Sequence, residues 1–182
     1  YALQSPFKKV YSVEIIGEIV DKARKRFAAN NSVEIIHNDS ITALEQMCSQ
    51  IKGNTVFWLD AHFPGADAGL TPYDSENNEE FRLPLERELE VIAAARKKYN
   101  DVLILDDLRI YEDGPYQNGN VPADALPKGK RSLDFVYRCF GKTHYVFKSY
   151  LDEGYILLFP KGKYNSNHFR LKDIFKKKPV TE

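Results

Sequence analysis

Long apolar runs and cysteine chemistry are both missing from this sequence. No stretch of about 18 consecutive apolar residues occurs, so no transmembrane helix is expected. No basic segment followed by an apolar one opens the residues given, which argues against a signal peptide there. The two cysteines, Cys48 and Cys139, have no CxxC spacing, and this argues against a zinc site, a thiol redox motif or a disulfide scaffold. We therefore expect a cytoplasmic protein without membrane contact.

An excess of charge of either sign is also missing. Lysine and arginine number 26, aspartate and glutamate number 26, and the formal net charge is zero. Proteins that bind nucleic acid or anionic membranes normally carry a basic excess, so we expect neither partner. The lysine run at residues 176–178 is typical of a solvated end. Residues 161–182 are therefore predicted to form a basic peripheral tail.

What the sequence does contain is an alternation of apolar runs with amphipathic segments. Its 182 residues, 43% of them apolar, fit one globular domain. Strands are predicted over 8–15, 32–37, 56–59, 102–105, 144–150 and 155–159, and helices over 17–29, 40–52, 83–99 and 133–140. The alternation predicts an α/β fold over residues 1–160, with a doubly wound, mostly parallel sheet and a C-terminal antiparallel hairpin. Because the run 56–59 is apolar throughout, we expect a central strand that is covered on both faces.

An acidic residue stands at the end of each predicted parallel strand. In order along the chain these strand-end positions are Glu14, Asn38-Asp39, Asp60 and Asp106-Asp107. Ligands of open α/β sheets bind outside the carboxyl ends of the strands, so these residues are the first candidates for a site.

The first two of these positions suit a nucleoside. The Glu14 carboxylate could accept hydrogen bonds from both ribose hydroxyls, as acids do in dinucleotide-binding folds. Asp39 could accept one from an adenine amino group. The alternatives are structural: Glu14 as an exposed strand-end acid, and Asp39 as an acid at a helix N-terminus, where the helix dipole favours it.

Asp60, Asp106 and Asp107 suggest a metal site. Two neighbouring strands would bring the three carboxylates together, and their mutual repulsion would favour a neutralising cation such as Mg²⁺. The alternative is structural: Asp107 caps a loop, and Asp106 points into a hydrogen-bond network. His62, two residues after Asp60, could act as a general base, as a metal ligand or as a plain loop residue.

Four of these segments together resemble the class I S-adenosylmethionine-dependent methyltransferases. Val10–Glu14 resembles their second strand, 36–40 the third, 57–62 the fourth, where the methyl group is transferred, and 104–107 the fifth. The terminal hairpin is similar to their last two strands. The acidic trio resembles the cation-dependent O-methyltransferases of sugars and natural products. The resemblance implies that Glu14, Asn38, Asp39 and Asp60 bind S-adenosylmethionine, and that Asp60, Asp106 and Asp107 bind Mg²⁺.

Two features depart from that family. Its glycine-rich loop, which follows the first strand, does not occur in the sequence given, so the first βα unit is expected to be absent here. His62 stands where the sugar enzymes usually have the last residue of an Asp-Gly-Asp turn.

We expect O-methylation of a small polar or glycan-type acceptor, with Asp60 and His62 as catalytic residues. Tyr73, Tyr111 and Tyr116, in the predicted loops 64–79 and 111–130, could stack on the acceptor or simply pack. A metal-dependent hydrolase or phosphotransferase and a non-catalytic methyltransferase-like module are the alternatives. The sequence is compatible with a homo-oligomer.

Overall fold

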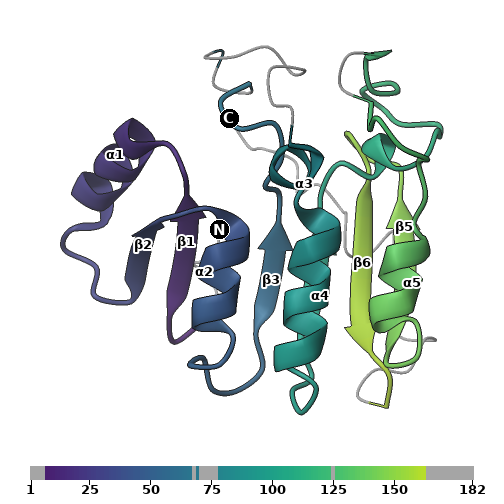
Figure 1. Ribbon diagram of the computed structural model, residues 1–182. Coiled ribbons are helices and arrows are strands. Elements are labelled where there is room, and N and C mark those ends of the chain that lie inside the picture. Colours follow the sequence, from purple (N-terminus) through teal and green to yellow (C-terminus); the bar gives the residue numbers. More distant parts are fainter. Residues whose placement is uncertain (1–6, 67–68, 70–77, 124–125, 163–182) are drawn as a thin grey trace, which may run out of the picture. The chain divides into compact units, whose positions relative to one another are not determined.

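The computed structural model describes residues 7–66, 69, 78–123 and 126–162. Its elements, in chain order, are β1 (Val10–Glu14), α1 (Gly17–Phe27), β2 (Val33–His37), α2 (Ser40–Met47), β3 (Val56–Leu59), α3 (Glu79–Arg82), α4 (Leu85–Ala95), β4 (Val102–Leu105), the 3₁₀ turn η2 (Leu108–Ile110), α5 (Asp134–Phe140), β5 (His144–Ser149) and β6 (Tyr155–Pro160) (Figure 1). They fall into two compact units, Tyr1–Lys52 with Ala61–Lys97 and Gly53–Asp60 with Lys98–Glu182. The alternation of strands and helices confirms the α/β class.

The first unit is built on the parallel pair β1–β2. Val10 lies opposite Val33 and Glu14 opposite His37, so both strands end at the same edge. Helix α2 contacts α4, and their buried side chains include Leu44 and Leu89. The buried guanidinium of Arg96, just after α4, donates to the carbonyl oxygen of Ile51 at 2.8 Å and so ties the two helix ends together.

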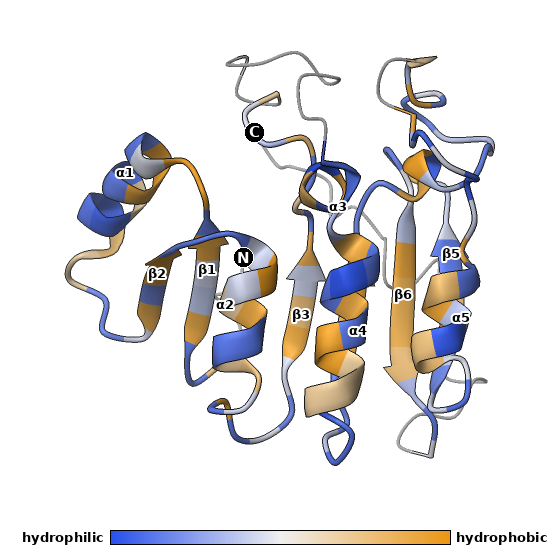
Figure 2. Ribbon diagram, in the orientation of Figure 1, coloured by the Kyte–Doolittle hydropathy of each residue, from blue (hydrophilic) through white to orange (hydrophobic). Residues whose placement is uncertain are grey.

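The second unit is a four-stranded sheet in the order β3-β4-β6-β5. Strands β3 and β4 are parallel, and β6 is antiparallel to both of its neighbours. Figure 2 shows apolar residues along β6, and Ile156 and Leu158 of that strand are fully buried. Helix α5 packs on β5, with Val136 and Phe140 buried. The antiparallel hairpin predicted for the last two strands is confirmed.

The expectation of one doubly wound sheet is wrong for the part of the chain described. Its strands form two sheets, one of two strands and one of four. The division arises because β1 finds a ladder partner only in β2, and β3 only in β4, among these strands.

The expectation that β3 is covered on both faces is also wrong. The strand has the predicted bounds, but Val56 is 43% and Trp58 57% exposed, whereas Phe57 and Leu59 are buried. Successive side chains of a strand point to opposite faces, and only one face of β3 is closely packed. An apolar run alone does not reveal this difference.

The helices are shorter than predicted. The helix expected over 83–99 is α4, which begins at Leu85, directly after Pro84, and ends at Ala95. Proline is common at a helix start because it has no N–H to donate within a helix. Helix α3 precedes this segment, at the end of the predicted loop 64–79. The predicted helix 40–52 ends at Met47. Among the residues described, none of the helices combines the length and apolar character that a membrane crossing requires.

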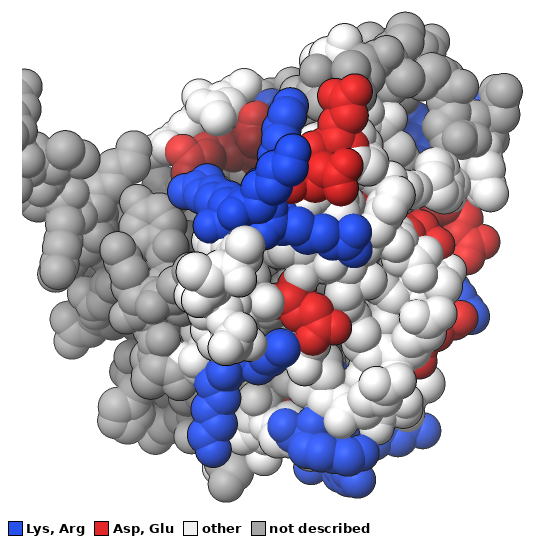
Figure 3. Space-filling view, turned by 90° about the vertical axis from the view of Figure 1, so that its left-hand side faces the viewer, with Lys and Arg blue, Asp and Glu red and all other residues white. Residues whose placement is uncertain are grey.

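The surface carries both signs of charge. On the face drawn in Figure 3, Lys and Arg side chains are interspersed with Asp and Glu. On α1 the basic residues Arg24, Lys25 and Arg26 occupy the last turn, where a cation stabilises the helix dipole. This distribution agrees with the zero net charge of the sequence.

Candidate functional site

In the first unit, the predicted nucleoside-binding residues lie together at the carboxyl edge of the β1–β2 sheet. The backbone N–H of Asn38 donates to the carbonyl oxygen of Glu14 at 3.2 Å, which joins the two strand ends. The Glu14 side chain turns toward the start of α1, where its Oε1 accepts from the N–H of Ile16 at 2.8 Å. Its Oε2 accepts no hydrogen bond from the residues described, so a ribose hydroxyl could still bind there.

Asp39 caps helix α2. Its Oδ1 accepts from the N–H of Thr42 at 2.8 Å, which satisfies one of the unpaired N–H groups of the first turn. Asn38 supports the same turn, because its Oδ1 accepts from the N–H of Asp39 at 3.0 Å. One of the two carboxylate oxygens of Asp39, Oδ1, therefore has the structural role of capping the helix. Its role in binding adenine stays a prediction.

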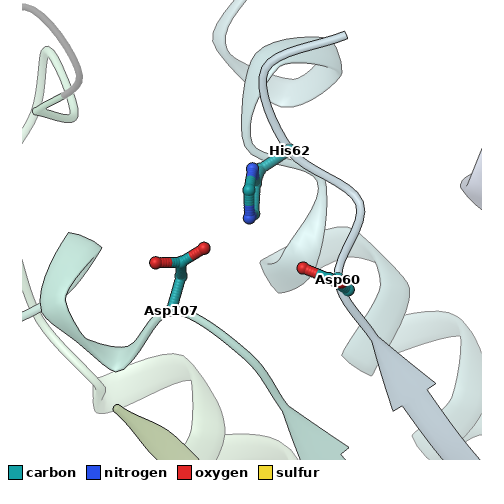
Figure 4. A group of neighbouring side chains, drawn as sticks. All are labelled: Asp60, His62 and Asp107. Carbon is teal, nitrogen blue, oxygen red and sulfur yellow. The ribbon is translucent and has the colours of Figure 1, made fainter. Parts of the chain in front are cut away.

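In the second unit, Asp60 and Asp107 bring two carboxylates together. Asp60 follows β3 and Asp107 follows β4 by one further residue, and the N–H of Asp106 donates to the carbonyl oxygen of Leu59 at 3.0 Å. Each aspartate offers an oxygen within 4.8 Å of the other (Figure 4). Asp60 is exposed, whereas Asp107 is only 7% exposed. One carboxylate is thus fixed inside the protein and the other is open to solvent.

The Asp106 side chain hydrogen-bonds to the backbone of the next residue. Its Oδ1 accepts from the N–H of Asp107 at 2.9 Å, and Asp107 has a left-handed backbone with φ of 53°. The left-handed residue makes a sharp turn directly after Asp106. The carboxylates that lie close together here are those of Asp60 and Asp107. Asp106 as a metal ligand stays a prediction.

Arg109 supplies a positive charge that the sequence reasoning missed. Its Nε donates to Asp107 Oδ1 at 3.0 Å, and its Nη2 donates to Glu153 Oε1 at 2.7 Å. The guanidinium group can bridge two carboxylates because its donors form a planar fork. The available signal was an arginine two residues after a strand-end acid, but the partner Glu153 lies 44 positions away along the chain.

His62 is connected to Asp60 by the chain itself. Two residues span at most about 7 Å, so the histidine backbone stays near Asp60. Within the first unit, the N–H of the next residue, Phe63, donates to the carbonyl oxygen of Arg82 at 2.9 Å, and its ring lies 4.9 Å from the Arg82 guanidinium. These contacts fix the turn that carries His62. Its role as base or ligand stays a prediction.

The loop tyrosines have different surroundings. Tyr116 is 7% exposed, its ring packs 5.3 Å from that of Tyr150, and burial raises the pKa of its hydroxyl. Its hydroxyl donates to the carbonyl oxygen of Glu112, so Tyr116 packs the loop rather than offering a face for stacking. Tyr111 lies edge-on to Phe135 at 5.3 Å. Tyr73 lies outside the described residues.

One aromatic pair was not anticipated. Trp58 of β3 lies edge-on to Tyr155 of β6, with the ring centroids 6.2 Å apart. Burial raises the pKa of Tyr155 to about 12, helped by the negative charges of Asp106 and Asp152. The exposed indole therefore lies on the face of the sheet where Tyr155 is close to the Asp106 carboxylate.

No family model matches the chain, and no curated protein matches its sequence.

Proposed function

We propose that this protein is an S-adenosylmethionine-dependent methyltransferase that methylates a hydroxyl group of a small polar or sugar-type acceptor with the help of a divalent cation. The observation that carries the proposal is that strand-end acids stand at the carboxyl ends of parallel strands in both units. In the second unit, β6 lies between β4 and β5 and is antiparallel to both. This agrees with what the family resemblance implies for the closing hairpin.

The residues of the first unit suit the nucleoside part of the cofactor. Ribose hydroxyls and the adenine amino group are donors, and they need acceptors. Glu14 and Asp39 each accept a backbone N–H with one carboxylate oxygen. Within the part of the chain that the structure describes, the second oxygen of each could accept from a ligand. The Asn38 side chain adds an amide at the same edge. We infer that Glu14 holds the ribose, and that Asn38 and Asp39 hold the adenine.

The carboxylate pair of the second unit suits a divalent cation such as Mg²⁺. Two oxygens on one hard cation lie at most about 4–5 Å apart, because each bond measures about 2.0–2.6 Å. Asp60 and Asp107 meet this limit, since their oxygens lie within 4.8 Å of each other. When bound, the cation would lower the pKa of an acceptor hydroxyl and orient its oxygen.

The remaining task of the protein is to accept a proton. S-adenosylmethionine supplies an activated methyl group, so catalysis consists mainly of positioning and of deprotonating the acceptor. His62, held near Asp60 by the chain, takes the proton that the hydroxyl loses as the methyl group passes to its oxygen. Asp60 binds the cation on the solvent-exposed side, where an acceptor can reach it.

The proposal is tested by calorimetric titration of S-adenosylhomocysteine into the protein, with and without Mg²⁺. We expect micromolar binding that weakens at least tenfold in Glu14→Ala. The matched control is Glu34→Ala, which removes a glutamate of the same sheet whose carboxylate pairs with Lys9 at 3.2 Å in mid-strand. Binding by the control should equal that of the wild type.

Two results would contradict the proposal. Absence of binding by the folded protein would overturn the methyltransferase assignment. Retained Mg²⁺ binding in that case would favour a metal-dependent hydrolase or phosphotransferase. Equal losses in Glu14→Ala and Glu34→Ala would remove the assigned ribose site.

A further inference from the structure

The turn that carries Asp107 is conformationally demanding. Asp107 combines a left-handed backbone, with φ of 53°, and a side chain that is almost fully buried. Few residues other than glycine adopt this conformation, although aspartate tolerates it better than most. A carboxylate in such a place keeps one orientation only if its neighbours fix it.

Arg109 fixes the Asp107 carboxylate from one side. Its Nε bonds to Asp107 Oδ1 at 3.0 Å while its Nη2 bonds to Glu153 Oε1 at 2.7 Å. The arginine side chain is 18% exposed, whereas that of Glu153 is 41% exposed. Arg109 therefore lies between two acids. The more exposed Glu153 holds the guanidinium in place, and the guanidinium in turn bonds to the buried Asp107.

The β5–β6 hairpin turn supports the same arrangement through its backbone. The N–H of Leu108 donates to the carbonyl oxygen of Gly154 at 3.0 Å, and the N–H of Arg109 donates to that of Glu153 at 3.3 Å. Gly154 has φ of 90°, and a Cβ atom there would lie only 2.9 Å from Leu108 Cβ. The hairpin turn and the Asp107 turn thus pack closely along the backbone as well.

We propose that Arg109, anchored by Glu153, is a positioning residue that sets the orientation of the Asp107 carboxylate for cation binding. The inference rests on the proposed function, because it concerns the cation of that site. An opposite effect also acts, since a guanidinium next to Asp107 repels a metal ion. When Arg109 is replaced by a neutral residue, loss of positioning would weaken cation binding, whereas loss of repulsion would strengthen it.

The test measures Mn²⁺ affinity by the paramagnetic resonance signal of free Mn²⁺. Arg109→Met removes the charge and the fork of donors, whereas Arg109→Lys keeps the charge and loses the fork. We expect both to weaken binding at least tenfold, and Glu153→Gln to weaken it about threefold. The control, Arg26→Met, removes an exposed arginine of α1 and should leave the affinity unchanged.

Each outcome decides between specific alternatives. Tighter Mn²⁺ binding in Arg109→Met, or unchanged Mn²⁺ binding in Arg109→Lys, would overturn the positioning role. The effect of Arg109 on the metal ion would then be charge repulsion alone. Absence of Mn²⁺ binding in the wild type would overturn the cation of the proposed function and this inference together. A purely structural role would lower the unfolding temperature and leave the affinity of the folded protein unchanged. If Arg109→Met does not fold, Arg109→Lys and Glu153→Gln decide the question.

Discussion

The two units use acids at the ends of parallel strands in different ways. In the first, Glu14 and Asp39 bond to backbone N–H groups at the starts of α1 and α2. In the second, Asp107 bonds to the guanidinium of Arg109. A backbone N–H is a partial charge, and the carboxylate keeps its net negative charge and a second oxygen for a ligand. A guanidinium is a full charge, so the pair is electrically balanced. The strand-end acids of the first unit therefore keep a net negative charge, whereas the charge of Asp107 in the second unit is already balanced by Arg109.

The largest expected effect is a loss of Mn²⁺ affinity on replacing Asp107, which distinguishes this acid from Glu14 and Asp39 of the first unit. Asp107→Asn should reduce Mn²⁺ affinity at least 100-fold, because the amide loses the charge that both the metal and Arg109 require. S-adenosylhomocysteine affinity measured without metal should change less than threefold, because Glu14 and Asp39 are untouched. Both are measured by calorimetric titration.

Asp113→Asn is the matched control. It removes another acid that pairs with an arginine, Arg131, at 2.7 Å, but one whose side chain is 72% exposed. It should leave Mn²⁺ binding intact. Equal losses in both variants would mean that overall charge, and not the Asp107 site, governs the affinity.

A second comparison concerns one glycine in each unit. Alanine at Gly154 should destabilise the protein by about 2 kcal/mol, because φ is 90° and the new Cβ would lie 2.4 Å from a Tyr116 ring carbon. Alanine at Gly17, the first residue of α1, meets only His37 at 3.5 Å, an ordinary contact. It should be neutral or stabilise by up to about 1 kcal/mol.

Chemical denaturation of the two alanine variants gives both free energies of unfolding. Equal effects would contradict the tight packing of the hairpin turn against the Asp107 turn. The Gly154 variant should also weaken Mn²⁺ binding, and the Gly17 variant should not.

The strands were predictable from the sequence and the sheets were not. The apolar runs 56–59 and 102–105 marked β3 and β4 to the residue, because buried strands are short and end abruptly at acids. Which strands share a ladder depends on contacts between distant segments, which local patterns do not contain. The same limit explains Trp58, since an apolar run does not tell which of its faces is covered.

The candidate site was predictable only in part, for a similar reason. Asp60 and Asp107 could be found from their places after neighbouring strands. The different task of Asp106 depends on the left-handed backbone of Asp107, which the sequence does not state. Arg109 could be noticed as a nearby cation, but its anchor Glu153 comes from the hairpin turn.

The smallest expected effect is a pH dependence that belongs to the second unit. His144 is 7% exposed, and burial lowers the pKa of its imidazole below the ordinary value near 6.5, with Lys161 acting in the same direction and Asp101 opposing. Its Nε2 hydrogen-bonds to the carbonyl oxygen of Asp101 at 3.1 Å and its Nδ1 to the Thr143 hydroxyl at 2.8 Å. Above pH 6.5 the folded and unfolded chains both hold a neutral ring, so stability does not depend on this group there. As the pH falls below 6.5, the unfolded chain takes up a proton that the folded chain binds less readily, and stability declines.

His144→Gln keeps a hydrogen-bond donor and removes the titration, so its loss of stability between pH 7 and pH 5 should be smaller than that of the wild type. Trp58, the single tryptophan, lies in the second unit, and its fluorescence during urea unfolding reports that unit directly. His37→Gln is the control in the first unit, because that histidine is exposed and its Nε2 bonds only to the carbonyl oxygen of Ile15, at 3.1 Å, among the described residues. An unchanged pH dependence in His144→Gln, or an equal change in His37→Gln, would show that acid sensitivity does not distinguish the two units through His144. If the pH dependence of stability decreased in His144→Gln alone, the two units would differ in this buried histidine of the second unit as well as in their strand-end acids.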